Sequence, residues 1–547
     1  MTQSSTKLKV GVVLESLEVP AWQYNLINSV RKSDYAAIVL LIVAKREKGS
    51  PERLSRPHSN QSVAYRAFKK IEDENRNIGP DACALSTASD LFQGIDRVSC
   101  KLTTAEQCSS PLVESVRARD LDILIVLAEP GPLTSSDSLA RLGVWYFEAD
   151  GYLFSPSDGS MVGFKELLGR RPYLSSSLQI LESGLRATRI AYQTVSAIDY
   201  LSHIVTRNEH LWKCSTFVLR ALKKCHELGG ETYLRSLQIA GTPKPQVAPQ
   251  VQIFAFPGYF FWRVYRKIYH LLFMERWILL FGPRNKQPSE KEFTALMPPT
   301  GRFWADPHAI VKDGLHHVFF EDASKQTGIG HISVMTSLGD GHFTAPKPAL
   351  RRPYHLSYPF LFEWRGTLFL IPESAENRTV ELYRCVKFPD QWEFELNLME
   401  NISAYDATLL EHNGRWWLFA NVREHDGAST WDELCIFHAD RPDSRNWQPH
   451  RSNPVVSDVR RARPAGSMFS ENGHLYRPSQ DSSQRYGKAL HINEVIELNE
   501  NAYREVSIAT IEPNWHRSIL AVHSYSRAGQ LTFVDAIHRE PKLRFLC

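Results

Sequence analysis

The sequence lacks the features that mark metal-binding, disulfide-rich or nucleic-acid-binding proteins. Its eight cysteines are scattered over 547 residues without a CxxC pair, so neither a zinc site nor a disulfide scaffold is expected. The net charge is only +4, and no dense block of Lys and Arg occurs. Such a weak charge argues against nucleic-acid binding. We therefore predict no metal, no cofactor and no nucleic-acid partner.

Long apolar runs are also missing. The N-terminus, MTQSSTKLKVGVVLES, has no apolar stretch of signal-peptide length, which predicts a protein of the reducing cytoplasm. The longest uncharged run, residues 245–262, is broken by three Pro, one Gly and three Gln. That composition argues against a transmembrane helix.

The first part of the chain alternates strand-like and helix-like patterns. Apolar runs predict buried strands at residues 10–14, 37–44, 122–128 and 143–147. A segment with helical spacing, residues 22–31, separates the first two. This order predicts a parallel α/β sheet in a domain that spans residues 1–241.

Residues 242–298 have the composition of a connector. Their start is rich in Pro and Gln, and residues 254–281 mix aromatic side chains with basic ones such as Arg263, Arg266 and Lys267. Two interpretations remain open. The segment is either an aromatic linker packed between two domains, or a cationic amphipathic segment in peripheral contact with the inner face of a membrane.

A repeat of short, aromatic-rich strands begins after Gly301. Four segments align without gaps, each with a turn glycine at the same place, at spacings of 52, 48 and 59 residues. The four turn glycines are Gly314, Gly366, Gly414 and Gly473. A weaker fifth copy starts at Ser518. Units of this length suit four-stranded blades, so residues 299–547 are predicted to form a five-bladed β-propeller.

Polar residues recur at two positions of this repeat. The position eight before the glycine holds Asp306, Tyr358, Asp406 and Ala465, and the position seven after it holds Glu321, Glu373, Asn421 and Gln480, with Asp322 and Asp481 just beyond. In a hairpin these positions lie at the same end, so they are predicted to line one mouth of the channel. Converging carboxylates repel one another, which separates their pKa values and supplies an acid and a base for sugar chemistry.

Two of these acids have distinctive neighbours. Asp306 lies in Trp-Ala-Asp-Pro and Glu373 follows Ile-Pro, so both are rigidly presented beside apolar residues. Aromatic side chains near them are suited to stacking on sugar rings. The competing interpretation is that acids at strand ends cap turns or bond to neighbouring blades.

The motifs of the repeat resemble a known propeller. They are WADP at 304–307, HLSYP at 355–359, IPES at 371–374, RPAG at 463–466 and RPSQD at 477–481. Together they resemble the propeller of glucosamine inositolphosphorylceramide transferase-like proteins, which is similar to those of family 43 and family 32 glycoside hydrolases. In those hydrolases a first-blade Asp is the base or nucleophile and a third-blade Asp tunes the acid. The resemblance implies these roles for Asp306 and Asp406.

The predicted site follows from these observations together. Asp306, Glu373 and Asp406 are the predicted catalytic carboxylates, with Glu373 as the acid, although the acid of those hydrolases lies in a later blade. The predicted substrate-binding residues are Trp304, His355, Tyr358, Glu321, Asn421, Arg463, Gln480, Asp481 and Tyr486. The expected ligand is a sugar, a nucleotide sugar or a glycoconjugate.

The N-terminal domain resembles, more weakly, the formyltransferase domain of methionyl-tRNA and sugar N-formyltransferases, a Rossmann-like α/β fold. The resemblance is carried by residues 9–14, 120–125 and 142–145. The family's catalytic Asn-x-His falls at Tyr146 and Glu148, and its later Asp falls near Arg186. All three positions are changed, so we predict that this domain does not transfer formyl groups from a folate.

Three functional hypotheses follow. The first is a carbohydrate-active enzyme, a glycosyltransferase or glycoside hydrolase-like protein, that acts at the propeller mouth in cell-surface glycan or glycolipid biosynthesis. The second is a non-catalytic glycan-binding or scaffold protein with degenerate enzyme domains. The third is an enzyme related to sugar N-formyltransferases.

Overall fold

The computed structural model describes residues 6–46, 79–102, 110–128, 139–149, 152–153, 161–182, 188–240, 255–286, 288–289, 291–339 and 341–542. The chain divides into two compact units. The first comprises residues 1–260 with 425–429, and the second comprises residues 261–424 with 430–547. Among the described helices, none combines the length and apolar composition that a membrane crossing requires.

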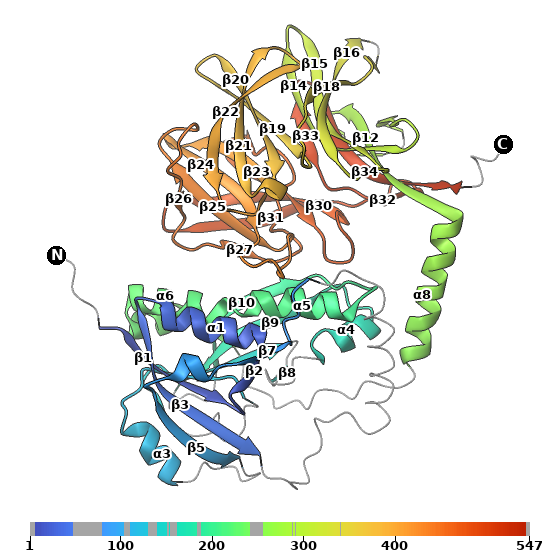
Figure 1. Cartoon of the computed structure of the whole chain (residues 1–547). Helices are drawn as coiled ribbons and strands as arrows, with labels where there is room; N and C mark the ends of the chain where they lie inside the picture. The colour runs from blue at the N-terminus through green and yellow to red at the C-terminus, as the bar shows by residue number, and fades with distance from the viewer. Residues whose placement is uncertain are drawn as a thin grey trace. The chain divides into compact units, whose positions relative to one another are not determined.

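A mixed nine-stranded sheet forms the first unit (Figure 1). In sheet order its strands are β5 (Asp96–Leu102), β3 (Ala36–Arg46), β1 (Leu8–Leu14), β6 (Ile123–Val126), β7 (Val144–Ala149), β9 (Leu174–Leu181), β10 (Thr188–Ser196) and β11 (Gln238–Ala240), with β8 (Tyr152–Leu153) beside β7. The first five are parallel neighbours, and the last three continue antiparallel.

The four strands predicted in this unit are confirmed, and so is their parallel pairing. The antiparallel extension was not predicted, because β9 has the sequence LSSSLQIL, in which three serines interrupt the apolar pattern. Formation of β9 depends instead on pairing with β7 and β10 on its two sides. A small separate sheet pairs β2 (Glu18–Pro20) with β4 (Leu85–Thr87).

The helices of the first unit are short. They are α1 (Ala21–Lys32), η1 (Ser89–Phe92), α3 (Ser110–Arg117), α4 (Phe164–Leu168), α5 (His203–Cys214), α6 (Phe217–Leu228) and α7 (Gly230–Ser236). The predicted helix at residues 22–31 corresponds to α1. It buries Trp22, Leu26, Ile27 and Val30, a spacing that places all four on one face.

Five antiparallel sheets form the blades of the second unit (Figure 1), as predicted. Blade 1 consists of β14 (Arg302–Lys312), β15 (Leu315–Ser324), β16 (Gly330–Gly339), β17 (His342–Phe343) and β18 (Lys347–Leu350). Blade 2 consists of β19 (Ser357–Trp364), β20 (Thr367–Ser374), β21 (Thr379–Lys387) and β22 (Gln391–Glu400), with the short helix η4 (Ala375–Asn377) after β20.

Blade 3 consists of β23 (Ala404–His412), β24 (Arg415–Val422), β25 (Glu433–Ala439), β26 (Gln448–Pro449) and β27 (Val456–Ser457). Blade 4 consists of β28 (Phe469–Glu471), β29 (His474–Asp481), β30 (Ala489–Leu498) and β31 (Tyr503–Ile511).

Blade 5 joins the two ends of the propeller sequence. Its strands are β13 (Thr294–Leu296), β12 (Phe273–Pro283), β34 (Leu531–Pro541), β32 (Ile519–Ala521) and β33 (Tyr525–Ala528). β12 pairs with β34 along its whole length, from Phe273 opposite Pro541 to Pro283 opposite Leu531. Pairing an early strand with the last one closes the ring and protects edges that would otherwise be open.

This closure corrects the expected domain plan. Residues 242–298 were predicted to be a connector before a propeller beginning at residue 299. In the structure residues 255–272 form helix α8 (Ala255–Leu272), and β12 and β13 are strands of blade 5. The strand that pairs with β12 runs from Leu531 to Pro541, near the other end of the propeller sequence, so no local pattern marks β12 as part of the propeller. Residues 241–254 lie outside the described part of the chain.

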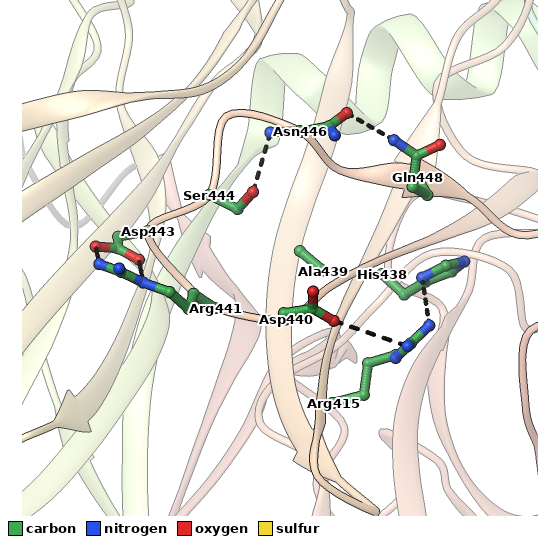
Figure 2. A pocket seen from close by; sticks show the side chains of 9 residues that line it. All are labelled: Arg415, His438, Ala439, Asp440, Arg441, Asp443, Ser444, Asn446 and Gln448. Atoms are coloured by element: carbon green, nitrogen blue, oxygen red, sulfur yellow. Dashed lines mark hydrogen bonds and ion pairs between the residues drawn. The ribbon is translucent and has the colours of Figure 1, made fainter.

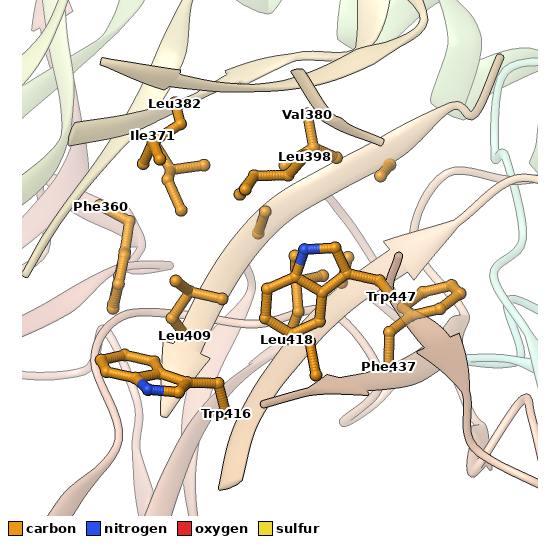
Figure 3. Packing of buried hydrophobic residues seen from close by; sticks show 14 of the residues in the cluster. Phe360, Ile371, Val380, Leu382, Leu398, Leu409, Trp416, Leu418, Phe437 and Trp447 are labelled. Carbon is orange, nitrogen blue, oxygen red and sulfur yellow. The ribbon is translucent and has the colours of Figure 1, made fainter. Parts of the chain in front are cut away.

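Apolar side chains fill the space between neighbouring blades. Figure 3 shows the cluster between blades 2 and 3. Its labelled members are Phe360, Ile371, Val380, Leu382 and Leu398 from blade 2, and Leu409, Trp416, Leu418, Phe437 and Trp447 from blade 3. Each buried side chain of this size contributes roughly 1.5–3 kcal/mol relative to an exposed one. Such packing holds the first strands of the blades in a fixed relation.

Gly466 provides a test of how tightly blade 4 meets blade 5. Its φ is 133°, and a Cβ atom there would lie 1.9 Å from the carbonyl oxygen of Tyr525. We expect Gly466→Ala to lower the free energy of unfolding by roughly 2–5 kcal/mol, because backbone strain and overpacking add. Gly414→Ala is the matched control, since its φ is 73° and nothing lies within 4 Å. Denaturant titrations that give equal losses would contradict this expectation.

Candidate active site

A shared backbone distortion positions three of the predicted site residues. The first strands of blades 1, 2 and 3 each contain a register shift near their beginning. The residue at this shift has positive φ in each blade, 52° at Asp306, 42° at Tyr358 and 54° at Asp406. Non-glycine residues rarely adopt such angles, and bulges of this kind re-aim side chains beside functional sites. The repeat predicted from sequence is therefore also a repeat of backbone geometry.

Arg463 joins the acids of blades 2 and 3. Its Nε donates to Oδ2 of Asp406 at 2.6 Å and its Nη2 donates to Oδ1 at 3.0 Å. The same Nη2 donates to Oε2 of Glu373 at 3.2 Å. Gln480 donates to Oδ2 of Asp406 at 2.8 Å. Charge-assisted bonds of this bidentate form are strong and directional, so they fix the relative positions of both carboxylates.

Asp306 belongs to a second group, shared with blade 5. Its Oδ1 accepts from Ser524 Oγ at 2.7 Å and lies 3.1 Å from Nε2 of His523. The other ring nitrogen of His523 lies 2.9 Å from Oδ2 of Asp535. Asp535 is fully buried and also accepts from the backbone N–H of Asp306. One imidazole is thus held between two carboxylates.

Tyr486 connects these two groups. Its ring centroid lies 5.0 Å from that of His523 and 5.2 Å from the guanidinium carbon of Arg463. Burial raises the pKa of the Tyr486 hydroxyl well above its usual range; Arg463 opposes this, while Asp406 and Asp306 add to it. Acids from blades 1 and 3 therefore act on one aromatic side chain. We call Asp306, Glu373, Asp406, Arg463, Tyr486 and His523 the central cluster.

A further acid and imidazole pair lies beside the central cluster. Oε1 of Glu321 is 3.3 Å from Nε2 of His355. Burial lowers the pKa of His355, but its hydrogen bond and ion pair with Glu321 outweigh this and raise it to about 9. Burial also raises the pKa of Glu321, and the charge of Asp306 adds to that effect. The predicted residues Glu321 and His355 are therefore partners and electrostatic neighbours of the cluster.

The two main acids acquire opposite acidities. Burial raises the pKa of Glu373 well above its usual range; Arg463 opposes this, while Asp406 and Asp306 add to it. Burial also raises the pKa of Asp306, but His523 and Ser524 outweigh that effect, and its pKa falls below the usual value. One cluster thus holds an acid whose pKa is raised and an acid whose pKa is lowered, the separation that acid–base chemistry uses.

Two predicted binding residues occupy structural positions instead. Trp304 lies in the blade 1 core and donates to Asp322 at 3.1 Å. The hydroxyl of Tyr358 bonds to Thr408 and accepts from the backbone N–H of Gly466, both at 2.8 Å. Both side chains are thus engaged in contacts within the propeller, in place of the stacking suggested by residue type.

Asp481 is likewise engaged within its own blade. It accepts from the backbone N–H of Ser483 at 2.9 Å and from Lys488 at 3.3 Å. These contacts lower its pKa to about 2 despite burial, with His491 and Ser483 as the main causes. Asp481 therefore follows the competing interpretation, in which an acid at a strand end caps a turn. It does so because it lies one residue beyond Gln480, which occupies the repeat position.

Two amide side chains at the ring positions retain hydrogen-bonding capacity. Asn421 and Gln480 are fully buried. Within the described residues, neither amide atom of Asn421 has a partner, and Oε1 of Gln480 has none. Buried polar groups are normally satisfied, so these atoms are available to a ligand hydroxyl or a water.

Sequence reasoning missed the blade 5 members of the cluster. His523, Ser524 and Asp535 lie in the weak fifth repeat, outside the offsets used for the other blades. In blade 3 the turn is Asn413-Gly414, both with positive φ, whereas in blade 5 Gly529 is the first residue of the turn. Because the glycine stands earlier in the blade 5 turn, the offsets counted from the glycine do not carry over from the other blades. The signal that sequence reasoning could have used is His523 before Gly529 and Asp535 after it.

Asp306, His523 and Asp535 are also of residue types that bind metal ions. One ligand atom each from Asp306, His523 and Asp535 lies within 4.8 Å of the others. In the structure His523 lies between the two acids; burial lowers the pKa of His523, but Asp535 and Asp306 outweigh this and raise it to about 10. A cation there would displace the imidazole proton.

A separate pocket lies on blade 3 (Figure 2). Its volume is about 610 Å³, and its lining includes Arg415, His438, Asp440, Arg441 and Asp443. The cations are paired within the rim, Arg415 with Asp440 at 3.7 Å and Arg441 with Asp443 at 2.5 Å. None of the predicted site residues lines this pocket, so we place the candidate site at the central cluster.

The role of Arg463 leads to a stability prediction. Arg463→Met leaves the buried Asp406 without its cation, which should cost roughly 3–5 kcal/mol of unfolding free energy. Arg441→Met is the control, because Arg441 forms an ion pair with Asp443 at the surface. This substitution should leave the denaturation midpoint unchanged. A midpoint for Arg463→Met that equals the wild-type value would show that Arg463 does not hold the cluster together.

Comparison with known proteins locates relatives of the propeller. A family model described as the N-terminal part of glucosamine inositolphosphorylceramide transferase 1 matches residues 294–525. Proteins of that name from Arabidopsis thaliana and Oryza sativa subsp. japonica are each 34% identical over 209 residues, 38% of this chain. The aligned part covers 27% and 28% of those proteins, so the chain spans about a quarter of their length. The resemblance expected from the propeller motifs is confirmed.

Two of the solved structures that this chain resembles are glycoside hydrolases. An α-L-arabinofuranosidase from Podospora anserina is 14% identical with a TM-score of 0.34, covering 48% of this chain and 94% of that chain. A family 117 glycoside hydrolase from Zobellia galactanivorans is 9% identical with a TM-score of 0.33, covering 48% and 91%. This chain is thus similar in sequence, over its propeller, to the N-terminal part of glucosamine inositolphosphorylceramide transferase 1.

Proposed function

We propose that this protein is a carbohydrate-active enzyme whose chemistry takes place at the central cluster. The observation that carries the proposal is that one cluster contains an acid of raised pKa, Glu373, and an acid of lowered pKa, Asp306. The relatives of the propeller, named as transferases that act with glucosamine and inositolphosphorylceramide, support a sugar or glycoconjugate as substrate. We place the reaction in the cytoplasm, in cell-surface glycan or glycolipid biosynthesis.

The cluster suits transfer of a glycosyl group. Glu373 donates its proton to the oxygen that leaves the anomeric carbon, while Asp306 accepts the proton of the attacking hydroxyl. The carbon–oxygen bond to the leaving group breaks and that to the acceptor forms. Arg463 holds Glu373 beside Asp406. Burial and the charge of Asp406 raise the pKa of Glu373, which favours the protonated form of Glu373 before the transfer. If water takes the place of the acceptor, the same groups support hydrolysis.

The competing proposal is a glycan-binding protein without turnover. It is favoured by the contacts of Asp306, because Ser524 and His523 both engage its Oδ1 and reduce its basicity. Under this proposal Asn421, Gln480 and the cluster bind sugar hydroxyls but perform no proton transfer. The two proposals differ in whether product is formed.

The relation of the N-terminal unit to formyltransferases remains a prediction. Tyr146 and Glu148, at the positions of the family's Asn and His, belong to a buried network with Gln179, which accepts from Tyr146 at 3.2 Å and donates to Glu148. Gln179 also accepts from Thr188 at 2.7 Å. Arg186 lies outside the described residues. Side chains satisfied by one another have no free group for proton transfer, which supports the proposal that the unit has lost this activity.

Replacing the two acids tests the proposed reaction. Asp306→Asn and Glu373→Gln should each lower turnover by roughly 100-fold or more, since general acid–base groups contribute that much. Asp481→Asn is the matched control, because that acid bonds within its own blade, and it should retain activity. Product is measured with nucleotide-activated amino sugars and inositolphosphorylceramide. Full activity in both variants would refute the enzyme proposal, and saturable glycan binding without product would favour the competing one.

The pH dependence of the rate provides a second test. Glu373 must stay protonated, so activity should fall as the pH rises through its raised pKa. Asp306 must stay ionised, so activity should fall as the pH drops through its lowered pKa. A bell-shaped profile of kcat/KM with a broad plateau around neutrality is expected. A rate that increases steadily with pH would exclude Glu373 as the acid.

A folate titration tests the N-terminal unit. We expect no formyl transfer from formyltetrahydrofolate by the full chain, even if the folate binds, because the proton-transfer residues of formyltransferases are replaced. Calorimetry measures folate binding, and product analysis measures formyl transfer. Saturable binding together with a formylated amino sugar as product would support the third hypothesis instead.

A further inference from the structure

Helix α8 carries a stripe of large apolar side chains exposed to solvent. Its members are between 46% and 74% exposed. They are Phe261, Val264, Tyr265, Ile268, Leu271 and Leu272. Because residues three and four apart share a side of a helix, all six fall on one face. An exposed apolar face of this extent is unusual on a soluble domain and marks an interaction surface.

The charged residues of α8 lie away from this stripe. They are Arg263 and Arg266, which are half-buried, and Lys267, which is exposed; burial lowers the pKa of His270, which is therefore not counted among them. With about 3.6 residues per turn, these positions are centred on the side opposite the stripe. The helix sequence AFPGYFFWRVYRKIYHLL contains no Asp or Glu. The helix is therefore apolar on one side and of a single charge sign on the other.

The remaining side of the helix packs against the protein. Tyr269 is 8% exposed, and its hydroxyl donates to Glu275 at 2.9 Å. Tyr269 also contacts the ring of Phe273 with 5.2 Å between centroids. The end of the helix is thus fixed to the start of β12, so the orientation of the stripe is set by the propeller that follows.

We propose that α8 is a membrane-surface helix that binds negatively charged lipid. Its apolar stripe enters the boundary between headgroups and acyl chains, and its basic side chains lie near anionic headgroups. Charge complementarity favours a lipid surface over a protein partner. A membrane with anionic lipid complements both the apolar stripe and the basic residues, whereas an apolar groove of a protein would complement the stripe alone. This binding does not depend on the chemistry at the central cluster.

Vesicle flotation with the full chain tests the proposal. The probes are vesicles of phosphatidylcholine alone and of phosphatidylcholine mixed with phosphatidylserine. Wild-type protein should float with the mixed vesicles, less so at high salt and little with phosphatidylcholine alone. The double variant Ile268→Glu with Leu271→Glu should abolish flotation. Lys267→Glu should weaken it roughly tenfold.

Leu338→Glu is the matched control. Leu338 is 64% exposed on blade 1, away from α8, so this variant should float as the wild type does. Thermal unfolding of each variant checks that folding is preserved. The proposal is overturned if the wild type floats with neither vesicle, or if the double variant floats undiminished. It is also overturned if sedimentation shows a dimer that the double variant loses, because a second copy then covers the stripe.

Discussion

The buried guanidinium of Arg463 is the interaction on which the rest of the site depends. It stands between Asp406, which it binds in bidentate fashion, and Glu373, which it contacts through one nitrogen. One positive charge cannot fully neutralise two adjacent carboxylates in a region of low dielectric constant, so the pKa of the less strongly bonded one rises. Glu373 is that acid, because Arg463 gives it one hydrogen bond and gives Asp406 two. The raised pKa of Glu373 is thus linked to the arginine geometry.

The propeller supplies the conditions for this arrangement. Ring closure by β12 and β34 fixes the five blades, and the apolar layers between blades fix their first strands. Backbone conformations with positive φ at Asp306, Tyr358 and Asp406 each cost free energy, roughly 1–3 kcal/mol. They persist because the surrounding packing determines them more strongly than local preference does. Two of the three residues serve the cluster, and Tyr358 bonds across to Thr408 and Gly466.

The pKa values of two buried acids shift in opposite directions here because their hydrogen-bond donors differ. Asp306 receives a hydroxyl donor and a charged imidazole, which stabilise its ionised form. Glu373 shares Arg463 with Asp406, which receives two of its three hydrogen bonds to these acids. The aromatic ring of Tyr486 contacts both His523 and Arg463. Assigning acid and base roles therefore requires the donors around each acid, and residue type alone does not provide them.

The sequence by itself determined the repeat, the turn glycines and the two ring positions, since hairpin geometry depends only on local spacing and turn type. It also predicted the buried strands of the first unit, because apolar periodicity is a local property. Tertiary structure alone decided that β12 belongs to blade 5, that β9 to β11 extend the first sheet, and that His523 and Asp535 complete the cluster around Asp306. It also decided that Trp304 and Tyr358 are structural while Arg463 controls Glu373. These outcomes depend on contacts between segments far apart in the chain, which no local pattern encodes.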